Sequence, residues 1–217
     1  MSAKKSVCFI DTNVIAHWIM SEGGVLNLLV EKYNLNKEFK DIYKERYSDS
    51  VTLIEKILDF SERDDLEFLF TNLCLKELFS AIRDELRSIV LFKKGVPISR
   101  WRDPRINPEF KKEDYNDVYE ILLESFDGLF QNGMIQPIPD IQPEDEKEYW
   151  NVYSSLLFLV KESQTQDVII LTTAIFNKGD YFITKDEKLI RSTKKILKDE
   201  YDLDIINPKN AIGILFK

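Results

Sequence analysis

The chain has 217 residues, of which 44% are hydrophobic and 31% are charged, and these values are typical of a globular protein with a sizeable core. Its formal net charge of −8 argues against a protein that coats nucleic acid through bulk electrostatics. Because no apolar run is long enough to span a bilayer and no secretory signal is recognisable, we expect a cytoplasmic protein without a membrane partner. Cys8 and Cys74 lie in apolar runs and are expected to be buried thiols.

The beginning of the chain is predicted to form a buried strand followed by helices. Residues 5–11 are a short apolar run that ends at a polar residue, so the carboxyl end of the strand should lie near Asp11. A helical pattern follows through Met20. Apolar positions then recur at helical spacing in residues 25–62, which predicts two or more helices.

A second strand and a second helix are predicted next, followed by a long loop. Residues 66–71 have the composition of a strand, and Asn72 is expected to cap the helix that carries Glu77. Residues 95–108 contain three prolines, a glycine and no helical period. They therefore predict a long surface loop inserted into the domain, a kind of segment that is often functional.

The rest of the chain alternates helices with short strands. Two prolines in residues 134–139 favour an edge strand or a short strand there. Ser163 and Gln166 fit a capping box, and Gly179 is expected at the position that closes the same helix. The expected elements are a helix over 115–130, a strand over 134–139, helices over 143–162 and 164–177, a strand over 180–184, a basic helix over 188–198, a strand over 203–206 and a helix beginning at Asn207 and Pro208.

This alternation predicts an α/β fold with a parallel sheet that is covered by helices on both faces. Ligands of such sheets bind beyond the carboxyl ends of the strands. Asp11 ends the first strand, and Asp186 lies two residues after Thr184, where the fourth strand should end. Asp167 lies in the first turn of its helix on the face that packs on the sheet, and Glu77 has small neighbours one helical turn away. Four acids are therefore predicted to meet at one edge.

Four carboxylates placed so closely repel one another, and without a counter-charge one or more would be protonated at neutral pH. Mg²⁺ or Mn²⁺ resolves this conflict, because these ions prefer oxygen ligands and retain several waters. A zinc site is not favoured, since the chain has a single histidine, His17, and two apolar cysteines. Taken singly, each acid is more simply explained as a helix cap or a surface ion pair. Their mutually consistent positions favour a shared metal site.

Two basic segments are candidate contacts for nucleic acid. Residues 92–112 carry seven basic residues against two acidic ones, a net charge of +5, and residues 185–198 carry six against two, a net charge of +4. A solvated surface explains such patches equally well. Trp101 has the chemistry to stack on a base or to anchor its loop on the domain. The candidate contacts are Lys93, Lys94, Arg100, Trp101, Arg102, Arg105, Lys188, Arg191 and Lys195.

Two polar residues near Asp11 have an alternative role that the sequence leaves open. His17 lies one helical turn after Asn13 and is expected to face the core rather than the site. Thr12 is expected either to support the site or to cap the first helix.

Three segments resemble the PIN-domain nucleases. They are residues 8–15 (CFIDTNVI), 77–78 and 167–189 (DVIILTTAIFNKGDYFITKDEKL). In that family an aspartate ends the first strand, a glutamate lies on a middle helix, an aspartate opens a later helix, and a T-x-D element follows the fourth strand. The matching residues in this chain are Asp11, Glu77, Asp167, Thr184 and Asp186. Phosphatases of the haloacid-dehalogenase type also have an aspartate after the first strand, but they need a second one where this chain has Asn13.

The resemblance implies a PIN-like three-layer α/β/α sandwich around a mainly parallel sheet of about five strands. We expect one domain over residues 1–217, with a helical elaboration at about 20–62 and the basic, proline-rich insertion at about 92–112. These additions make the chain longer than the compact toxin members of the family.

The implied function is that of a metal-dependent endoribonuclease, which hydrolyses RNA phosphodiester bonds through a four-carboxylate Mg²⁺ or Mn²⁺ site. The alternative from a different class is a catalytically weak PIN-like module that binds RNA or protein. The resemblance points to RNA as the substrate and leaves open a homodimer and an inhibitor or antitoxin protein as partners. The expected metal ligands and catalytic residues are Asp11, Glu77, Asp167 and Asp186, with Asn13 and Thr184 as the residues that orient them.

Overall fold

The computed structural model describes residues 5–35, 37–59, 65–101, 103, 105–106, 108, 112–130, 133–140, 146–160 and 165–216. Its centre is a five-stranded sheet formed by β1 (Ser6–Ile10), β2 (Leu66–Thr71), β3 (Ile135–Ile138), β4 (Tyr181–Ile183) and β5 (Asp204–Ile206). All neighbouring strands are parallel, and their order is β3-β2-β1-β4-β5. The predicted α/β class with a parallel sheet of about five strands is therefore confirmed.

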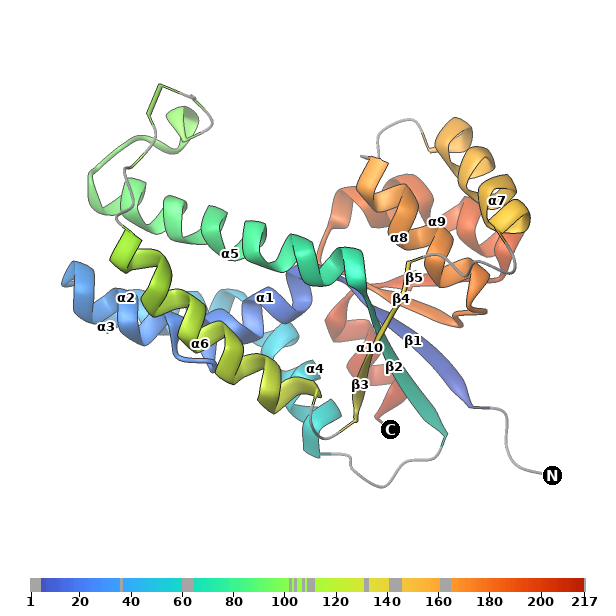
Figure 1. Ribbon diagram of the computed structural model, residues 1–217, viewed down its shortest axis with the longest axis horizontal. Helices are drawn as coiled ribbons and strands as arrows, with labels where there is room; N and C mark the ends of the chain where they lie inside the picture. Colours follow the sequence, from blue (N-terminus) through green and yellow to red (C-terminus); the bar gives the residue numbers. More distant parts are fainter. Residues whose placement is uncertain are drawn as a thin grey trace.

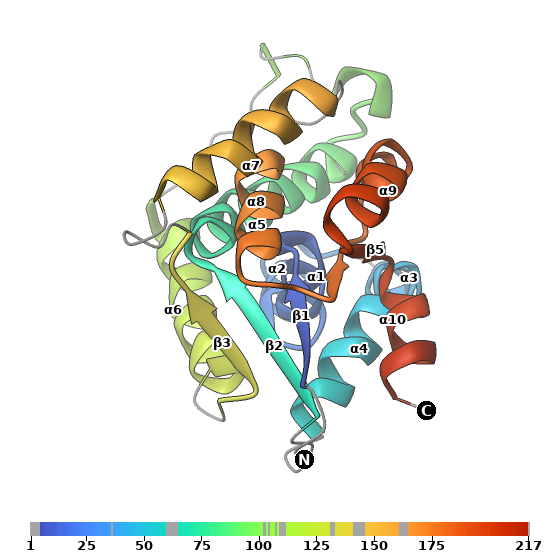
Figure 2. The same cartoon turned by 90° about the vertical axis from the view of Figure 1, so that its right-hand side faces the viewer.

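Helices cover both faces of this sheet (Figures 1 and 2). They are α1 (Thr12–Ser21), α2 (Val25–Tyr33), α3 (Lys37–Arg46), α4 (Ser48–Asp59), α5 (Asn72–Lys93), α6 (Lys112–Phe130), α7 (Glu146–Leu159), α8 (Thr165–Phe176), α9 (Glu187–Tyr201) and α10 (Pro208–Leu215), with a short 3₁₀ turn at Ile98–Arg100. Figure 1 shows α1 to α6 on one side of the sheet and α7, α8 and α9 on the other. In the described ranges, no helix is both long and apolar enough to cross a membrane.

The central strand β1 is the most deeply buried part of the sheet. Cys8, Phe9 and Ile10 are each at most 1% exposed, and Cys74 on α5 is also fully buried, as the sequence predicted for both cysteines. Pro137 lies in β3, which pairs only with β2. Because an edge strand has one hydrogen-bonding side free, it accommodates a residue that has no N–H group.

Two helix ends differ from the sequence prediction. Thr71, not Asn72, caps α5, because the last residue of β2 remains extended and its Oγ1 accepts a hydrogen bond from the Cys74 N–H at 3.1 Å. After α8, Lys178 and not Gly179 has the left-handed backbone, with φ of 55°. The predicted capping residue Ser163 lies outside the described residues. The Asn207 cap with Pro208 at the first position of α10 is confirmed.

Gly179 is required for close packing rather than for an unusual φ. A Cβ atom at this position would lie 3.0 Å from the Ala174 carbonyl oxygen and 3.0 Å from a ring carbon of Phe9, a buried residue of β1. The glycine therefore lets the end of α8 approach β1.

We expect Gly179→Ala to lower the free energy of unfolding by about 1–3 kcal/mol, because the new methyl group overpacks this contact. Urea unfolding followed by circular dichroism measures the change. The matched control is Gly213→Ala in α10, where a Cβ meets nothing within 4 Å. That substitution should raise stability by about 0.5–1 kcal/mol, since alanine favours a helix. Equal destabilisation by both would contradict the packing argument.

Candidate functional site

The pairing of β1 with β4 places Asp11 beside Thr184. Ile10 lies opposite Ile183, and the Asp11 N–H donates to the Ile183 carbonyl oxygen at 2.9 Å. The next residue of each strand therefore faces the other across the carboxyl edge of the sheet. Thr184 Oγ1 donates a hydrogen bond to Asp11 Oδ2 at 2.5 Å. This edge is also where the strand order reverses between β1 and β4, the usual ligand position in open α/β sheets.

Asp11 is held in place by the first turn of α1. Its Oδ1 accepts the Thr12 N–H at 2.7 Å, so Asp11 itself caps the helix and the capping alternative for Thr12 is wrong. Its Oδ2 accepts a second bond from Asn13 Nδ2 at 2.5 Å. Asn13 Oδ1 accepts the Lys185 N–H at 2.9 Å, which ties the loop after β4 to α1. Asn13 and Thr184 thus lie where they fix the orientation of the Asp11 carboxylate.

Glu77 reaches the same edge from the second turn of α5. Thr12 Oγ1 lies 3.1 Å from Glu77 Oε2 and donates to it, and it lies 3.4 Å from the Cys74 carbonyl oxygen. The sequence analysis did not anticipate this link between Thr12 and Glu77. The two residues are 65 positions apart, and only the packing of α1 against α5 brings them together.

All four predicted acids line one cleft of about 340 Å³ at this edge. Asp167 lies in the first turn of α8, and Asp186 caps α9 by accepting the N–H groups of Lys188 and Leu189 at 2.8 and 3.0 Å. The cleft thus collects acids from the ends of two strands and the beginnings of two helices. The lining residues are Asp11, Thr12, Asn13, Glu77, Ser80, Ala81, Gln166, Asp167 and Asp186.

The electrostatics of the cleft are those of crowded carboxylates. Asp11 is only 9% exposed, and burial, reinforced by the charges of Glu77 and Asp167, raises its pKa to about 7 despite the hydrogen bonds from Thr184 and Thr12. Burial also raises the pKa of Glu77, and the charges of Asp167 and Asp140 add to it, while the bond from Thr12 acts against them. In the described part of the chain, neither Asp11 nor Glu77 forms an ion pair with a lysine or arginine.

The cleft is not arranged as a closed metal site. Within the described ranges, no group of three or more His, Cys, Asp or Glu side chains has the arrangement of a metal-binding cluster. The donor set nevertheless consists entirely of oxygen atoms in an open cleft. Such a set fits a hard divalent cation, which retains several waters and is bound by few carboxylates directly.

Asp140 is an additional acid that the sequence analysis missed. It lies two residues after β3, at the same edge of the sheet, and its Oδ1 accepts the Leu73 N–H at 2.9 Å. Its negative charge contributes to the raised pKa of Glu77. Its position after an edge strand was the available signal, since the carboxyl ends of parallel strands meet at one edge.

The basic residues of α9 begin beside the cleft. Asp186 caps this helix, so the exposed Lys188 lies two residues after a residue that lines the cleft. Arg191 and Lys195, which are also exposed, lie about one and two turns farther along the helix. The Arg191 guanidinium also donates to the Glu187 carbonyl oxygen at 3.2 Å.

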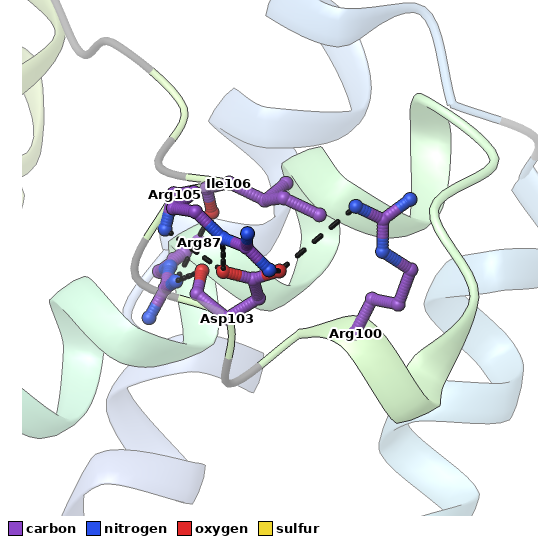
Figure 3. Close-up of polar contacts among 5 residues, drawn as sticks. All are labelled: Arg87, Arg100, Asp103, Arg105 and Ile106. Carbon is purple, nitrogen blue, oxygen red and sulfur yellow. Dashed lines mark hydrogen bonds and ion pairs between the residues drawn. The ribbon is translucent and has the colours of Figure 1, made fainter.

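The basic insertion lies at the far end of α5 from the sheet (Figure 1). From Glu77 to Lys93 the helix rises about 24 Å. Arg105 contacts Asp103 through two side-chain bonds of 3.0 Å, Arg100 lies 3.9 Å from the same carboxylate, and Arg87 of α5 donates to the Asp103 and Ile106 carbonyl oxygens (Figure 3). The bonds from Arg87 hold the loop against α5. The Asp103 carboxylate neutralises part of the positive charge of Arg100 and Arg105.

The other insertion candidates have different surroundings. Lys93 and Lys94 are exposed at the end of α5, and Arg102 lies outside the described residues. Trp101 is partly buried and its indole N–H donates to the Val96 carbonyl oxygen at 2.8 Å. Trp101 therefore anchors its loop, one of the two roles that the sequence allowed.

His17 faces the core, as predicted. It is 7% exposed, stacks on Tyr47 with ring centroids 3.8 Å apart, and its Nδ1 lies 3.3 Å from Ser50 Oγ. Burial, together with the positive charges of Lys185 and Arg46, lowers its pKa to about 3. The imidazole is therefore neutral in the folded protein at physiological pH.

We expect this histidine to destabilise the protein in acid. The unfolded chain binds a proton near pH 6.5 whereas the folded chain does not until about pH 3, so stability is lost as the pH falls through that window. The loss attributable to this group is at most on the order of 5 kcal/mol. His17→Phe should flatten the dependence of the urea midpoint on pH between 6.5 and 4, relative to wild type. An unchanged slope would show that other groups govern acid unfolding.

Comparisons with known proteins add little to this description. No family model matches the chain, and no curated protein matches it. A solved structure that matches is the crystal structure of VapBC2 from Rickettsia felis bound to a DNA fragment from their promoter. The TM-score is 0.42 at 13% sequence identity, over 93% of this chain and 98% of that chain. Any function for this chain must therefore be argued from its own cleft.

Proposed function

We propose that the chain is a divalent-metal-dependent endoribonuclease that hydrolyses RNA phosphodiester bonds in the acidic cleft. The observation that carries this proposal is the convergence of Asp11, Glu77, Asp167 and Asp186 on one cleft, with Asp11 almost fully buried. Gathering several carboxylates in one cleft is unfavourable unless a cation neutralises them, and in the described part of the chain Asp11 and Glu77 form no ion pair with a lysine or arginine. The choice of RNA over DNA follows the resemblance to the PIN-domain nucleases.

The metal proposed is Mg²⁺ or Mn²⁺, with Asp11 and Asp167 as the main ligands and Glu77 and Asp186 completing the set directly or through water. A cation bound there supplies Lewis-acid stabilisation of phosphate charge and lowers the pKa of a bound water. The protein's own part is to hold the ligands still. Thr184 and Asn13 both donate to Asp11 Oδ2, and this fixes which lone pairs of the carboxylate face the cleft.

The chain's cations would hold the substrate beside this site. Lys188 is the second residue of α9 and follows Asp186 of the cleft by two positions, and Arg191 lies three residues farther on the same exposed face of the helix. Contacts of this kind bind phosphates and position a strand without selecting its sequence. Because the chain has a net charge of −8, we expect phosphate to be attracted only near such clusters of basic residues.

Removing one proposed metal ligand should abolish cleavage. We expect Asp11→Asn and Asp167→Asn to lower the rate of Mn²⁺-dependent cleavage of single-stranded RNA by at least about 100-fold, because each removes a charged ligand. Gel analysis of a labelled oligoribonucleotide measures the rate, and circular dichroism checks the fold. The matched control, Asp127→Asn, changes an exposed acid on α6 and should cut like wild type.

The same assay separates the alternatives. If wild type binds RNA but cuts none in Mn²⁺, and Asp11→Asn leaves binding unchanged, the chain is a binding module. Turnover of a generic phosphomonoester with no cleavage of RNA would instead indicate a phosphatase.

Metal binding should be detectable without any substrate. We expect Mn²⁺ to raise the thermal unfolding temperature of wild type, because a ligand that binds only the folded state stabilises it by an amount that grows with the logarithm of its concentration above the Kd. A Glu77→Gln Asp167→Asn double variant should lose most of this shift. Thermal scans in EDTA give the reference for each protein. A shift of equal size in the double variant would place the cation elsewhere.

Thr12 should act as a positioning residue for Glu77. We expect Thr12→Val to reduce cleavage about 10-fold, because it removes the hydroxyl that donates to Glu77 Oε2 while it preserves the shape of the side chain. Thr12→Ser retains the hydroxyl and should restore most of the rate. If valine and serine behave alike, the contact does not matter for cleavage.

A further inference from the structure

A second pocket, of about 260 Å³, lies between α3 and α5, and Trp101 of the insertion lines one side of it. Five aromatic rings line it: Phe39, Tyr43, Tyr47, Phe92 and Trp101. Phe92 is 56% exposed although it belongs to this cluster, so the pocket opens to solvent. No role in the proposed hydrolysis accounts for so many rings at this place.

Two charged side chains share the pocket with the rings. The Glu85 carboxylate is partly buried in its wall, where the Tyr43 hydroxyl lies 3.4 Å from Oε2 and donates to it. The Arg46 guanidinium lies over the Tyr47 ring, 5.4 Å from its centroid. The pocket thus combines flat apolar walls with a carboxylate that accepts hydrogen bonds and a guanidinium that donates them, which is a combination that recognises a planar heterocycle.

Helix α5 connects this pocket to the acidic cleft. Glu77, Ala81 and Glu85 follow one another along it at intervals of four residues, so Glu85 lies about 12 Å beyond Glu77. Inside the core, His17 lies one turn after Asn13 in α1 and stacks on Tyr47, and this contact joins the pocket wall to the helix that Asp11 caps. A nucleic-acid strand that passes through the cleft can therefore reach the pocket within a few nucleotides.

We propose that this pocket binds a nucleobase of the single-stranded substrate, and that Glu85 makes guanine the preferred base; this inference rests on the proposed nuclease function. Stacking on aromatic rings accepts any base. A carboxylate accepts hydrogen bonds, and guanine alone presents two adjacent N–H donors, N1–H and N2–H, on its Watson–Crick edge. Arg46 is placed to donate to an acceptor on the same base or to its phosphate.

Charge distribution favours this pocket over another aromatic one. The groove lined by Phe79 and Tyr119, between α5 and α6, faces a helix that is strongly acidic. The pocket near Trp101 instead has Arg46 among its lining residues. In the chain, Lys93 directly follows Phe92 and Arg100 directly precedes Trp101. Phosphate is therefore attracted more to the pocket near Trp101 than to the groove beside α6.

The test measures binding without cleavage. Labelled oligouridine and the same oligomer with a single guanosine are titrated against the full chain in EDTA, and fluorescence anisotropy gives the affinity. We expect the guanosine oligomer to bind about 10-fold more tightly, and Glu85→Gln to remove that preference while oligouridine binding stays unchanged. An oligomer with a single adenosine serves as the comparison for stacking alone.

Variants of Trp101 separate stacking from loop anchoring. Trp101→Ala should weaken binding of every oligomer about 10-fold, whereas Trp101→Phe loses the bond to Val96 but keeps a ring and should bind nearly as wild type. Trp150→Ala, which changes an exposed ring on α7, is the matched control. Urea unfolding of each variant shows whether the fold is retained.

The outcomes distinguish this inference from the nuclease function. Equal affinity for all oligomers, or a guanosine preference that survives Glu85→Gln, would overturn the pocket assignment while cleavage by wild type continued. A concentration-dependent dimer that Trp101→Ala disrupts would show that a second copy of the chain covers the pocket. Conversely, guanosine binding in a protein that cuts no RNA in Mn²⁺ would overturn the nuclease and leave the base site standing.

Discussion

The hydrogen bond from Thr184 to Asp11, at 2.5 Å, is the contact on which the rest of the site depends. It exists because β1 and β4 are adjacent parallel strands whose last residues are in register. A shift of one residue in that register would no longer pair Ile10 with Ile183, and Asp11 and Thr184 would then not lie side by side on the same face. The position of the cleft is therefore determined by the pairing of two buried apolar strands.

Helix α5 connects the acidic cleft at this edge of the sheet with the aromatic pocket and the basic insertion. Near its beginning it presents Glu77 to the cleft, two turns later it presents Glu85 to the aromatic pocket, and at its end it supports the basic insertion. Its buried face, which includes Leu78, Ile82 and Leu86, packs into the core and fixes the rotation of the helix. Core packing thus decides which polar side chains of α5 point into the cleft and into the pocket. Glu77 and Glu85, which line the two, are about 12 Å apart along this one helix.

The sequence predicted most elements and the gathering of acids, because both depend on local pattern and on the rule that parallel strands end at one edge. It predicted β2 at residues 66–71 and the edge position of Pro137 in β3. It did not predict the bond between Thr12 and Glu77, and it left loop anchoring as one of two roles for Trp101. The first contact depends on how α1 packs on α5, which no spacing within a single helix encodes. The second is a bond from the Trp101 indole to the Val96 carbonyl oxygen within an irregular loop, where no periodic pattern indicates the partner.

The overall negative charge is compatible with a substrate that is itself negative, provided that attraction is local. Asp11 and its neighbours repel phosphate until a cation is bound, so an apo cleft would not hold RNA on its own. Lys188 in the first turn of α9 and Arg46 in the aromatic pocket are not among the residues that line the acidic cleft. On the proposed function, strand binding and metal binding would therefore be distinct requirements. A strand held by these cations would meet the acids only where a cation had already cancelled their charge, and hydrolysis would be restricted to the metal-loaded protein.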